Sequence, residues 1–575
     1  MQSMSARQKL FAIKEALAYE RESFESVWTD VAAFIKPRAL RWIEDSPTQR
    51  GSKAHQKIID PTASLAARTL VSGLNSSTIN PSRPWQAYRA FLGEVEDDTN
   101  IKAYLARCEE IDRDVILQSN FYSEAAKFTE SSVLFGTAAM MVEQDDERVF
   151  RCETFPIGSY YLGKSSRGKI DQFLRVYSDS AKNIVAEFGK ENCSPNLVRQ
   201  AENIRQQNTR YDVMHYIGPN ENYNPKRKFD KTAKKFKSCY IEVGVSGSSD
   251  TSRDSQNPLP AGYDNMYLRE SGYNDFPVMV HRWTADGQDI WGSDYPAALA
   301  LGHIKELQKL RKMTAQGVEL SVKPSMQGPI GSKNTQVQML PGFTNWVDQN
   351  NGGIRPTHEV RPDLQGAMGY GADIRNQINE IFFVSLFLML ANDRRSGTKA
   401  REIEELHQEK MTLLAPVLER FTDEFLDPFS NRVFDMVEEA GMHPLPPPEA
   451  QGLSLDIEYI NILATTLKMQ GIATLDRALA ITGQVGAGKP EALDNINADR
   501  YLRQYYASLN VDARVQNTLE EMAAIRKQRA DAAQQQAMEQ QGQATLEGAK
   551  TLSETKLSDD NALTQLLRTS QGGPR

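Results

Sequence analysis

The stretch from Gly483 to Pro490, GQVGAGKP, has the residue types and spacing of a phosphate-binding loop. The pattern G-x-x-x-x-G-K places backbone amides around a phosphate chain while the lysine reaches the terminal phosphates. In that motif a serine or threonine that holds magnesium follows the lysine, but here Pro490 follows Lys489, and proline also lacks an amide hydrogen. Residues 476–482, just before it, have a helical pattern, whereas the motif follows a strand. We therefore expect a glycine-rich turn and no nucleotide or other cofactor.

Histidine and cysteine spacing gives no recognisable metal or catalytic pattern. The seven histidines include no His-x-x-x-His pair. The four cysteines, Cys108, Cys152, Cys193 and Cys239, include no Cys-x-x-Cys pair. This predicts neither structural zinc nor a disulfide framework and favours a reducing compartment. Because nothing indicates a nucleophile with its base, we expect no catalytic residue and no metal site.

Two groups of basic residues are candidates for contact with phosphates. Arg394 and Arg395, with Lys399 and Arg401 behind them, form a cluster next to a glycine. In a single chain the simple interpretation is an exposed loop before a helix. If the loop repeated around a ring, its charges would add up to a collar that contacts nucleic-acid phosphates without reading sequence.

The second group is Lys305, Lys309 and Lys312, which recur at i, i+4 and i+7 and so share one face of a helix. Three interpretations stay open: a solvated face, pairing with acidic residues of a neighbouring copy, or a lysine stripe that lines a channel. The densest basic run, Pro225–Lys237, is either a solvated loop or a contact with another protein or with nucleic acid.

Composition limits the class of protein. A length of 575 residues corresponds to about four structural units. Hydrophobic residues make up 40% and charged residues 25%, which is globular. The 67 basic and 75 acidic residues give a net charge of −8, which argues against simple coating of nucleic acid. The apolar run Ile381–Ala391 is too short to cross ~30 Å of hydrocarbon and the N-terminus lacks an apolar signal core, so we expect a soluble, cytoplasmic protein.

The N-terminal part of the chain alternates between helical and strand-like patterns. Helices are expected over Ser5–Ile35, from Pro61 to Ser72 with Asp60 as a cap, and over Asn100–Leu117 and Tyr122–Phe135 before Gly136; Asn80–Trp85, with its two prolines, should be extended. From Thr137 to Trp291, short β-rich runs are bounded by turn residues: Ala138–Glu143, Tyr160–Leu162, Phe173–Tyr177, Tyr211–Ile217 and Cys239–Val245.

A different arrangement begins at Gly292. Tyr295–Glu319 is expected to be one helix of about 25 residues, or ~37 Å, and Gly371–Ala391 another of about 21 residues, or ~31 Å. Between them Ser321–Val360 is broken into short strands by glycine and proline. The second half of Gly371–Ala391 is apolar on every side, which predicts burial on every side. After a polar loop at Asn392–Thr398, a long helix over Lys399–Ala440 should kink at Pro416 and Pro428.

Two helices of that length cannot shelter both of their faces within one chain. Side-by-side packing with further copies would cover them, and a cyclic arrangement of copies closes a ring around a channel.

In the order of its motifs the sequence resembles the portal, or head-to-tail connector, proteins of short-tailed bacteriophages (podovirus type). The matching stretches are Ile58–Ala63, Ile79–Trp85, Ser119–Tyr122, Val133–Ala138, Phe276–Trp283, Gly292 with the helix after it, and Thr398–Leu418. One departure is Gln86, which stands where the resemblance leads us to expect an aromatic residue.

The resemblance implies an α+β, mainly α fold assembled as a ring of twelve copies. Its expected regions are a wing (1–291), a first stem helix (292–320), a small β-containing clip (321–368), a second stem helix (369–391), a channel loop (392–398), a kinked wing and crown helix (399–449), a helical crown (450–515) and a Gln/Ala-rich tail (516–575).

The same resemblance implies a non-enzymatic structural protein of the virion, assembled in the host cytoplasm, through which DNA is packaged and ejected. Its expected partners are further copies of itself, double-stranded DNA held non-specifically in the channel, the terminase large subunit, tail or adaptor proteins, and the major capsid and scaffolding proteins, but no membrane. The alternatives from other classes are a catalytic packaging protein, such as a terminase ATPase and nuclease, and another ring-forming tail adaptor.

Overall fold

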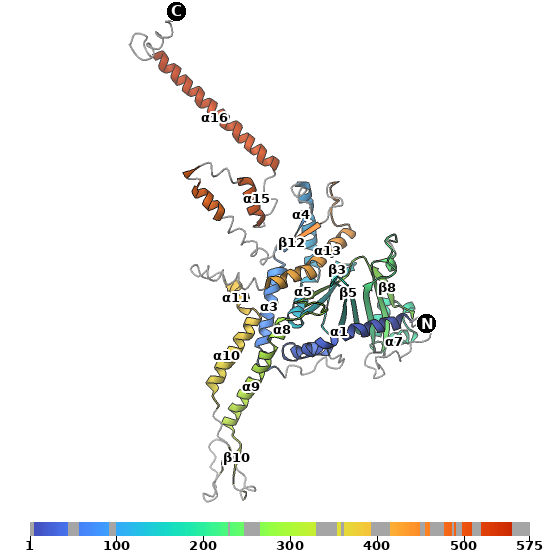
Figure 1. Cartoon of the computed structure of the whole chain (residues 1–575). Helices are drawn as coiled ribbons and strands as arrows, with labels where there is room; N and C mark the ends of the chain where they lie inside the picture. The colour runs from blue at the N-terminus through green and yellow to red at the C-terminus, as the bar shows by residue number, and fades with distance from the viewer. Residues whose placement is uncertain are drawn as a thin grey trace, which may run out of the picture. The chain divides into compact units, whose positions relative to one another are not determined.

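The computed structural model describes residues 5–43, 57–90, 99–227, 230–245, 265–328, 330, 354–357, 362–392, 414–448, 455–459, 477–485, 488–489, 497–508 and 519–554. The chain forms two compact units (Figure 1). The first consists of Met1–Glu96 with Ala103–Leu479, and the second of Asp97–Lys102 with Ala480–Arg575. The expectation of a mixed α+β, mainly helical protein is confirmed by the elements described below.

The first unit begins with helices whose ends follow from local sequence. The helices before its sheets are α1 (Ala6–Phe34), α2 (Leu40–Ile43), α3 (Thr62–Thr78), α4 (Thr99–Gln118) and α5 (Phe121–Phe135), with a 3-10 turn at Pro37–Ala39. Ser5 and Gln8 form a reciprocal capping box at the start of α1. Helix α5 stops at Gly136, whose φ of 72° is the left-handed conformation that glycine accepts without a steric cost. The predictions for α1, α4 and α5 are therefore confirmed.

Two N-terminal predictions were wrong in detail. Helix α3 extends to Thr78 rather than ending near Ser72, because its apolar face continues through the buried Leu74. The segment after it is not extended: the amide of Arg83 donates to the carbonyl oxygen of Asn80 at 3.2 Å, and the Asn80 side chain accepts from the amide of Ser82. Asn80 thus initiates a turn, which prolines after it permit.

Two antiparallel sheets form the middle of the first unit. The smaller has the order β3-β2-β9, and the larger has the order β4-β5-β6-β7-β8. Their strands are β2 (Thr137–Asp145), β3 (Val149–Phe155), β4 (Tyr160–Lys164), β5 (Ile170–Ser180), β6 (Arg210–Pro219), β7 (Phe236–Val245), β8 (Arg269–Tyr273) and β9 (Val278–Arg282). The five strand-like runs expected between Thr137 and Trp291 lie in β2, β4, β5, β6 and β7, so these predictions are confirmed.

Elements that the sequence interpretation missed complete this region. Helices α6 (Ala181–Phe188) and α7 (Pro195–Glu202) lie between β5 and β6 and begin at the serine caps Ser180 and Ser194. The strand pair of β1 (Gln86–Ala90) with β12 (Leu455–Tyr459), which joins distant segments, was also missed. The short pair of β10 (Met326–Gln327) with β11 (Arg355–Pro356) lies within Ser321–Val360, where short strands were expected.

Aromatic side chains form the centres of the two largest cores. In one, Trp28 of α1 meets Trp291 edge-on, with ring centroids 4.9 Å apart. In the other, Phe121 and Phe128 of α5 stack on Phe429 and Phe425, each with centroids 4.1 Å apart. Offset stacking of this kind adds to the free energy of apolar burial. Gln86, where an aromatic residue was expected, is buried and accepts a hydrogen bond from Ser430 at 2.6 Å.

The two long helices predicted after Gly292 are present but interrupted. The first is divided into α8 (Pro296–Leu299) and α9 (Leu301–Val322). The second begins earlier than expected, as α10 (Leu364–Ile381), and continues after a break as α11 (Val384–Asn392). At the break Phe383 has a φ of 52°, which is unusual for a bulky residue. In the single chain Phe382 and Leu386 are buried but Leu388 is 51% exposed, so burial on every side is not observed.

The helix expected over Lys399–Ala440 is described from residue 414. It is helical over 414–421, passes through a π-helical turn at Thr422–Leu426 and continues as α13 (Asp427–Glu439). The irregular turn directly precedes Pro428, where a kink was expected, because a proline ring clashes with the carbonyl four residues earlier. Gly441, with a φ of 69°, lies just beyond the end of α13.

The second unit contains α15 (Ala498–Ser508) and α16 (Leu519–Glu554). The guanidinium of Arg526 in α16 donates to both carboxylate oxygens of Asp499 in α15, at 2.6 and 2.8 Å. Helix α16 makes up more than half of the Gln/Ala-rich segment 516–575.

Candidate functional site

Helices α9 and α10 pack side by side and antiparallel, and α10 also packs against α3 (Figure 1). Ile304 and Leu307 of α9 and Ile374 and Ile378 of α10 are buried in the same core. Close approach of the helices is possible at Gly371, where a Cβ atom would lie 3.4 Å from Leu310 Cδ2. The paired helices are therefore joined by apolar packing at the end that meets the body of the unit.

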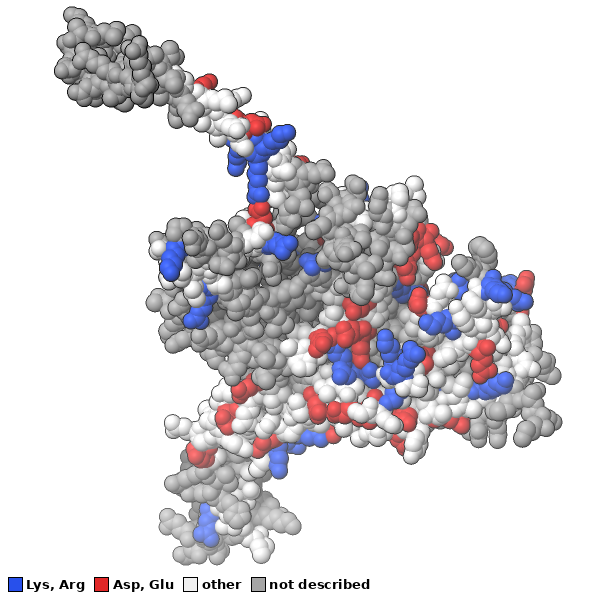
Figure 2. Space-filling model, turned by 45° about the horizontal axis from the view of Figure 1, so that its top comes forward, with Lys and Arg blue, Asp and Glu red and all other residues white. Residues whose placement is uncertain are grey.

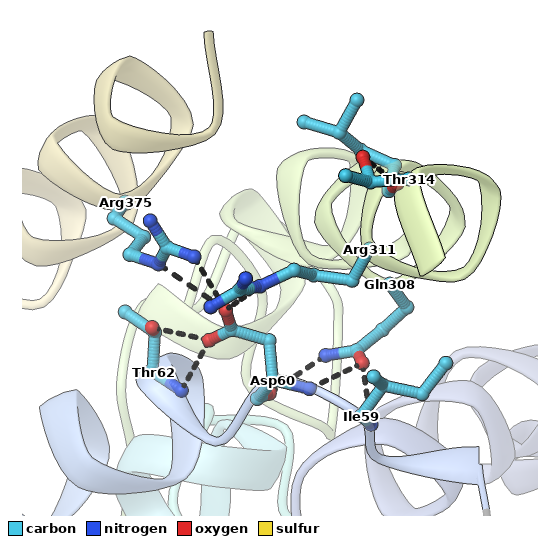
Figure 3. Close-up of polar contacts among 8 residues, drawn as sticks. Ile59, Asp60, Thr62, Gln308, Arg311, Thr314 and Arg375 are labelled. Atoms are coloured by element: carbon cyan, nitrogen blue, oxygen red, sulfur yellow. Dashed lines mark hydrogen bonds and ion pairs between the residues drawn. The ribbon is translucent and has the colours of Figure 1, made fainter. Parts of the chain in front are cut away.

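A buried carboxylate ties both helices to the segment before α3 (Figure 3). Asp60 Oδ2 accepts from Nε of Arg311 in α9 at 3.1 Å and from the terminal nitrogen of Arg375 in α10 at 2.9 Å. Asp60 Oδ1 accepts from the hydroxyl of Thr62 at 2.5 Å and from its amide at 3.1 Å. Only 3% of the Asp60 side chain is exposed. We call Asp60, Thr62, Gln308, Arg311 and Arg375 the Asp60 anchor.

Gln308 of α9 completes the Asp60 anchor through the backbone. Its side-chain oxygen accepts from the amides of Ile59 and Asp60, at 2.7 and 2.9 Å, and its side-chain nitrogen donates to the carbonyl oxygen of Asp60 at 2.8 Å. Gln308 is buried, so these groups would be costly to leave unpaired. One side chain of α9 thus fixes the position of the chain that enters α3.

The ionisation of Asp60 follows from this arrangement. Burial alone would raise the pKa of its carboxyl group, but hydrogen bonds from Thr62, Arg375 and Arg311 outweigh burial and hold the pKa well below its ordinary value. Asp60 is therefore ionised at neutral pH and balances one of the two guanidinium charges beside it. The sequence interpretation gave Asp60 a capping role only; the arginines come from helices distant in sequence.

A second buried ion pair joins the smaller sheet to the π-helical turn. The guanidinium of Arg282 in β9 donates to Glu424 Oε1 at 2.6 Å, and the Arg282 amide donates to Glu424 Oε2 at 2.9 Å. Both side chains are largely buried. Glu424 lies four residues before Pro428, so the irregular turn also positions the carboxylate that meets Arg282.

The far ends of the paired helices carry exposed apolar side chains. Met313, Val322 and Met368 are 58%, 73% and 66% exposed, in contrast with the buried Ile304 and Ile378 near the body. Contact with another chain would remove these apolar side chains from water.

The predicted phosphate-contacting residues fall into two groups. Arg394, Arg395, Lys399 and Arg401 lie outside the described residues, so their role stays a prediction. Lys305, Lys309 and Lys312 lie on α9 and are all exposed, and Nζ of Lys305 is 2.6 Å from Asp30 Oδ2 of α1. The structure therefore gives Lys305 a partner within the chain.

The basic run Pro225–Lys237 connects β6 to β7. Lys226, Arg227 and Lys231 are exposed, whereas Lys237 pairs with Glu270 of β8 at 2.9 Å. On the face drawn in Figure 2, basic and acidic side chains are interspersed among the coloured residues.

The segment that resembles a phosphate-binding loop is helical at its start. Residues 477–485 form a helix that includes Gly483, and the amide of Lys489 donates to the carbonyl oxygen of Val485 at 2.9 Å. The helical prediction for the residues before the loop is thus confirmed over 477–482, and a phosphate-binding loop would require a strand there.

The described residues contain neither a cluster suited to a metal ion nor a helix suited to a membrane. No group of three or more His, Cys, Asp or Glu side chains there could hold a metal ion. None of the described helices combines the length and apolar character needed to cross a bilayer.

Comparison with known proteins gives full-length relatives. The portal protein of Salmonella phage epsilon15 is 36% identical over 571 residues, which cover 99% of each chain. The probable portal protein of Bordetella phage BPP-1 is 33% identical over 580 residues, which cover all of both chains. Residues 7–516 match the family described as bacteriophage head to tail connecting protein. On this evidence the chain belongs to the family of bacteriophage head to tail connecting proteins.

Proposed function

We propose that this chain is the subunit of a portal ring, which occupies one vertex of a phage capsid and passes DNA during packaging and ejection. The observation that carries this proposal is the similarity, along the whole chain, to a protein named as a portal protein. A ring subunit of this kind acts by assembly and needs no reaction of its own. The helix over residues 477–485 agrees with that view, because a catalytic packaging ATPase requires a phosphate-binding loop after a strand.

Exposed apolar side chains on α9 and α10 support assembly. Met313, Val322 and Met368 would remain in water if the chain acted alone. Burial of apolar surface stabilises by about 25 cal/mol per Å², so neighbours that cover these side chains gain free energy with every contact. Repetition of the contact by rotation closes a ring.

Within the ring we assign α9 to the first stem helix and α10 with α11 to the second. The region between them would be the clip, to which β10 and β11 contribute, and the sheets with the N-terminal helices would be the wing. We assign residues 392–398 to the channel loop, 399–449 to the kinked wing and crown helix, 450–515 to the crown and 516–575 to the tail. Twelve copies are the number that the family resemblance implies.

The proposed partners are double-stranded DNA in the channel, the terminase large subunit during packaging, and tail or adaptor proteins afterwards. Contacts with the major capsid and scaffolding proteins would hold the ring at its vertex in the virion, after assembly in the host cytoplasm. We place Arg394 and Arg395 at the channel. If they contact translocating DNA, the double variant Arg394→Ala with Arg395→Ala should assemble normally and package DNA less efficiently; normal packaging would contradict this assignment.

Electron micrographs of the purified full-length protein test the function directly. We expect flat rings with a central hole, and rotational averaging of the images counts the copies. A compact monomer at every concentration tested would overturn the proposal.

A further inference from the structure

We propose that Lys309 on α9 of one copy pairs with Asp373 on α10 of the next copy, and that this contact fixes how neighbouring copies meet. The inference rests on the proposed ring and adds which faces of the paired helices are in contact. We call Lys305, Lys309 and Lys312 the lysine face, and Asp373, Gln377 and Glu380 the acidic face. The acidic face, like the lysine face, recurs at i, i+4 and i+7 and is exposed.

The two faces lie on opposite outer sides of the helix pair. At 100° per residue, Lys309 lies roughly 160° around α9 from Leu307, which is buried in the shared core. On α10, Asp373 and Glu380 lie roughly 140° and 160° from the buried Ile378. Each face therefore points away from the partner helix of the same chain, one basic and the other acidic.

Lys309 and Asp373 also lie at the same height along the pair. Leu310 faces Gly371 across the antiparallel contact, and Gly317 faces Pro362. Measured from the level of Leu310 and Gly371, Lys309 is one residue and Asp373 is two residues nearer the body. With a rise of 1.5 Å per residue, their heights differ by only about 2 Å. In a closed ring whose axis runs along these helices, all copies have the same height, so residues that pair between neighbours must have matching heights.

Within one chain these charges have little compensation. Among the described residues, no ion pair involves Lys309, Lys312, Asp373 or Glu380, and Asp373 accepts a hydrogen bond from Gln377 of its own helix at 3.2 Å. Lys305, by contrast, already pairs with Asp30. This leaves Lys309 and Lys312 for a contact with another copy, and of the two Lys309 lies closer in height to Asp373.

Surface shape agrees with the charges. Met313 and Leu320 border the lysine face and are 58% and 42% exposed, an unfavourable arrangement for a face that only water covers. Near Asp373 on α10, Gly369 has nothing within 4 Å of the position that a Cβ atom would occupy. A flexible methionine that projects from one copy can therefore lie against an open, flat part of the next.

Opposite faces that complement each other give a head-to-tail contact, the type that generates a ring. This arrangement places Lys309 between copies. A channel-lining lysine, the other interpretation of this stripe, would need no acidic residue at matching height.

A charge exchange in the full-length protein tests the pairing. We expect Lys309→Glu and Asp373→Lys each to raise the protein concentration at which rings form by about tenfold or more, because like charges then meet at every contact around the ring. The double variant Lys309→Glu with Asp373→Lys should restore ring formation close to that of the wild type. Ring fraction is measured by light scattering after size-exclusion chromatography and by negative-stain micrographs, at low and at high salt.

The controls separate this inference from the proposed function. Lys182→Glu changes an exposed lysine of α6 by the same charge and should leave assembly unchanged. Circular dichroism checks that each variant folds, and the milder pair Lys309→Gln and Asp373→Asn replaces any variant that does not. If the wild type forms no rings, the proposed function fails. If it does, then single variants that form normal rings, or a double variant that is no better than the single ones, overturn the pairing alone.

Discussion

Asp60 and Arg375 meet at 2.9 Å although 315 positions separate them in the chain. The same carboxylate oxygen also binds Arg311, so one acidic residue in front of α3 holds an arginine from each of the paired helices. The apolar contact between α9 and α10 alone would allow one helix to slide a small distance along the other. The hydrogen bonds that Arg311 and Arg375 donate to Asp60 are directional, so they fix the position of each helix. The Asp60 anchor therefore determines where α9 and α10 leave the body of the unit.

Replacement of Asp60 by asparagine should destabilise the first unit by about 2 to 3 kcal/mol. The change keeps the shape of the side chain but leaves two guanidinium groups without their countercharge, and loss of one member of a buried ion pair commonly costs about 3–5 kcal/mol. The lower figure is expected because Arg311 is half exposed. Chemical denaturation at a fixed assembly state measures the effect. Asp146→Asn, on an exposed acidic residue, is the matched control and should change stability by less than about 0.5 kcal/mol.

Acid should weaken the Asp60 anchor in a defined pH range. The pKa of Asp60 is lower in the folded protein than in the unfolded chain, so its contribution is fully present above the unfolded value of about 4 and is lost as the pH falls toward the folded value. The difference in unfolding free energy between the wild type and Asp60→Asn should thus be constant from about pH 7 to pH 5 and shrink below about pH 4. A difference that does not change down to pH 3 would show that Asp60 is not held as an anion.

His281 should make the stability of the protein depend on pH in a higher range than Asp60 does. Its ring accepts or donates a hydrogen bond at Ser132 Oγ, 2.8 Å away, and burial, with the charges of Arg420 and Arg282, lowers the pKa of His281 to about 3. The unfolded chain binds a proton below about pH 6.5 while the folded protein does not, so acid favours unfolding between these values by at most about 1.4 kcal/mol per pH unit. Stability measured from pH 7 to pH 4 should fall more steeply for the wild type than for His281→Gln. Equal slopes would contradict the prediction.

Two glycines in helices should respond in opposite ways to alanine. At Gly73 of α3, a Cβ atom would overlap the ring of Phe387 in α11. Gly73→Ala should destabilise the contact between α3 and α11 by about 1–3 kcal/mol. At Gly302 of α9, no atom lies within 4 Å of the position that a Cβ atom would occupy. Gly302→Ala should therefore raise the free energy of unfolding by up to about 1 kcal/mol through helix propensity. Thermal unfolding compares the stability of both variants with that of the wild type. A higher stability of Gly73→Ala would contradict the packing of Phe387 against α3.

Local signals explain which elements could be predicted from the sequence. Ser5 and Gly136 mark helix ends through hydrogen bonds to neighbouring residues, and the helices they bound were found closely. Strands β1 and β12 are far apart in sequence, so their pairing leaves no local signal. The break at Phe383 was missed because nothing in an apolar run distinguishes one residue in the left-handed conformation.

The same limit applies to the candidate site. Spacing alone located Lys305, Lys309 and Lys312 on one face of α9, which is confirmed, because a helix repeats over short distances. The link from Asp60 to Arg311 and Arg375 depends on how three separate helices pack, so residue types could not show it. Charge complementarity between α9 and α10 likewise became visible only when their antiparallel register was known.

The left-handed residue at Phe383 makes α10 and α11 two rods with a joint between them. A continuous helix keeps one direction along its length, whereas a break of this kind allows α10 and α11 to have different directions. A bulky residue with a positive φ costs conformational energy, and glycine at position 383 would cost less. Retaining phenylalanine here thus gives the joint a stiffness that glycine would not, and makes the angle between the rods a property that a single substitution can tune.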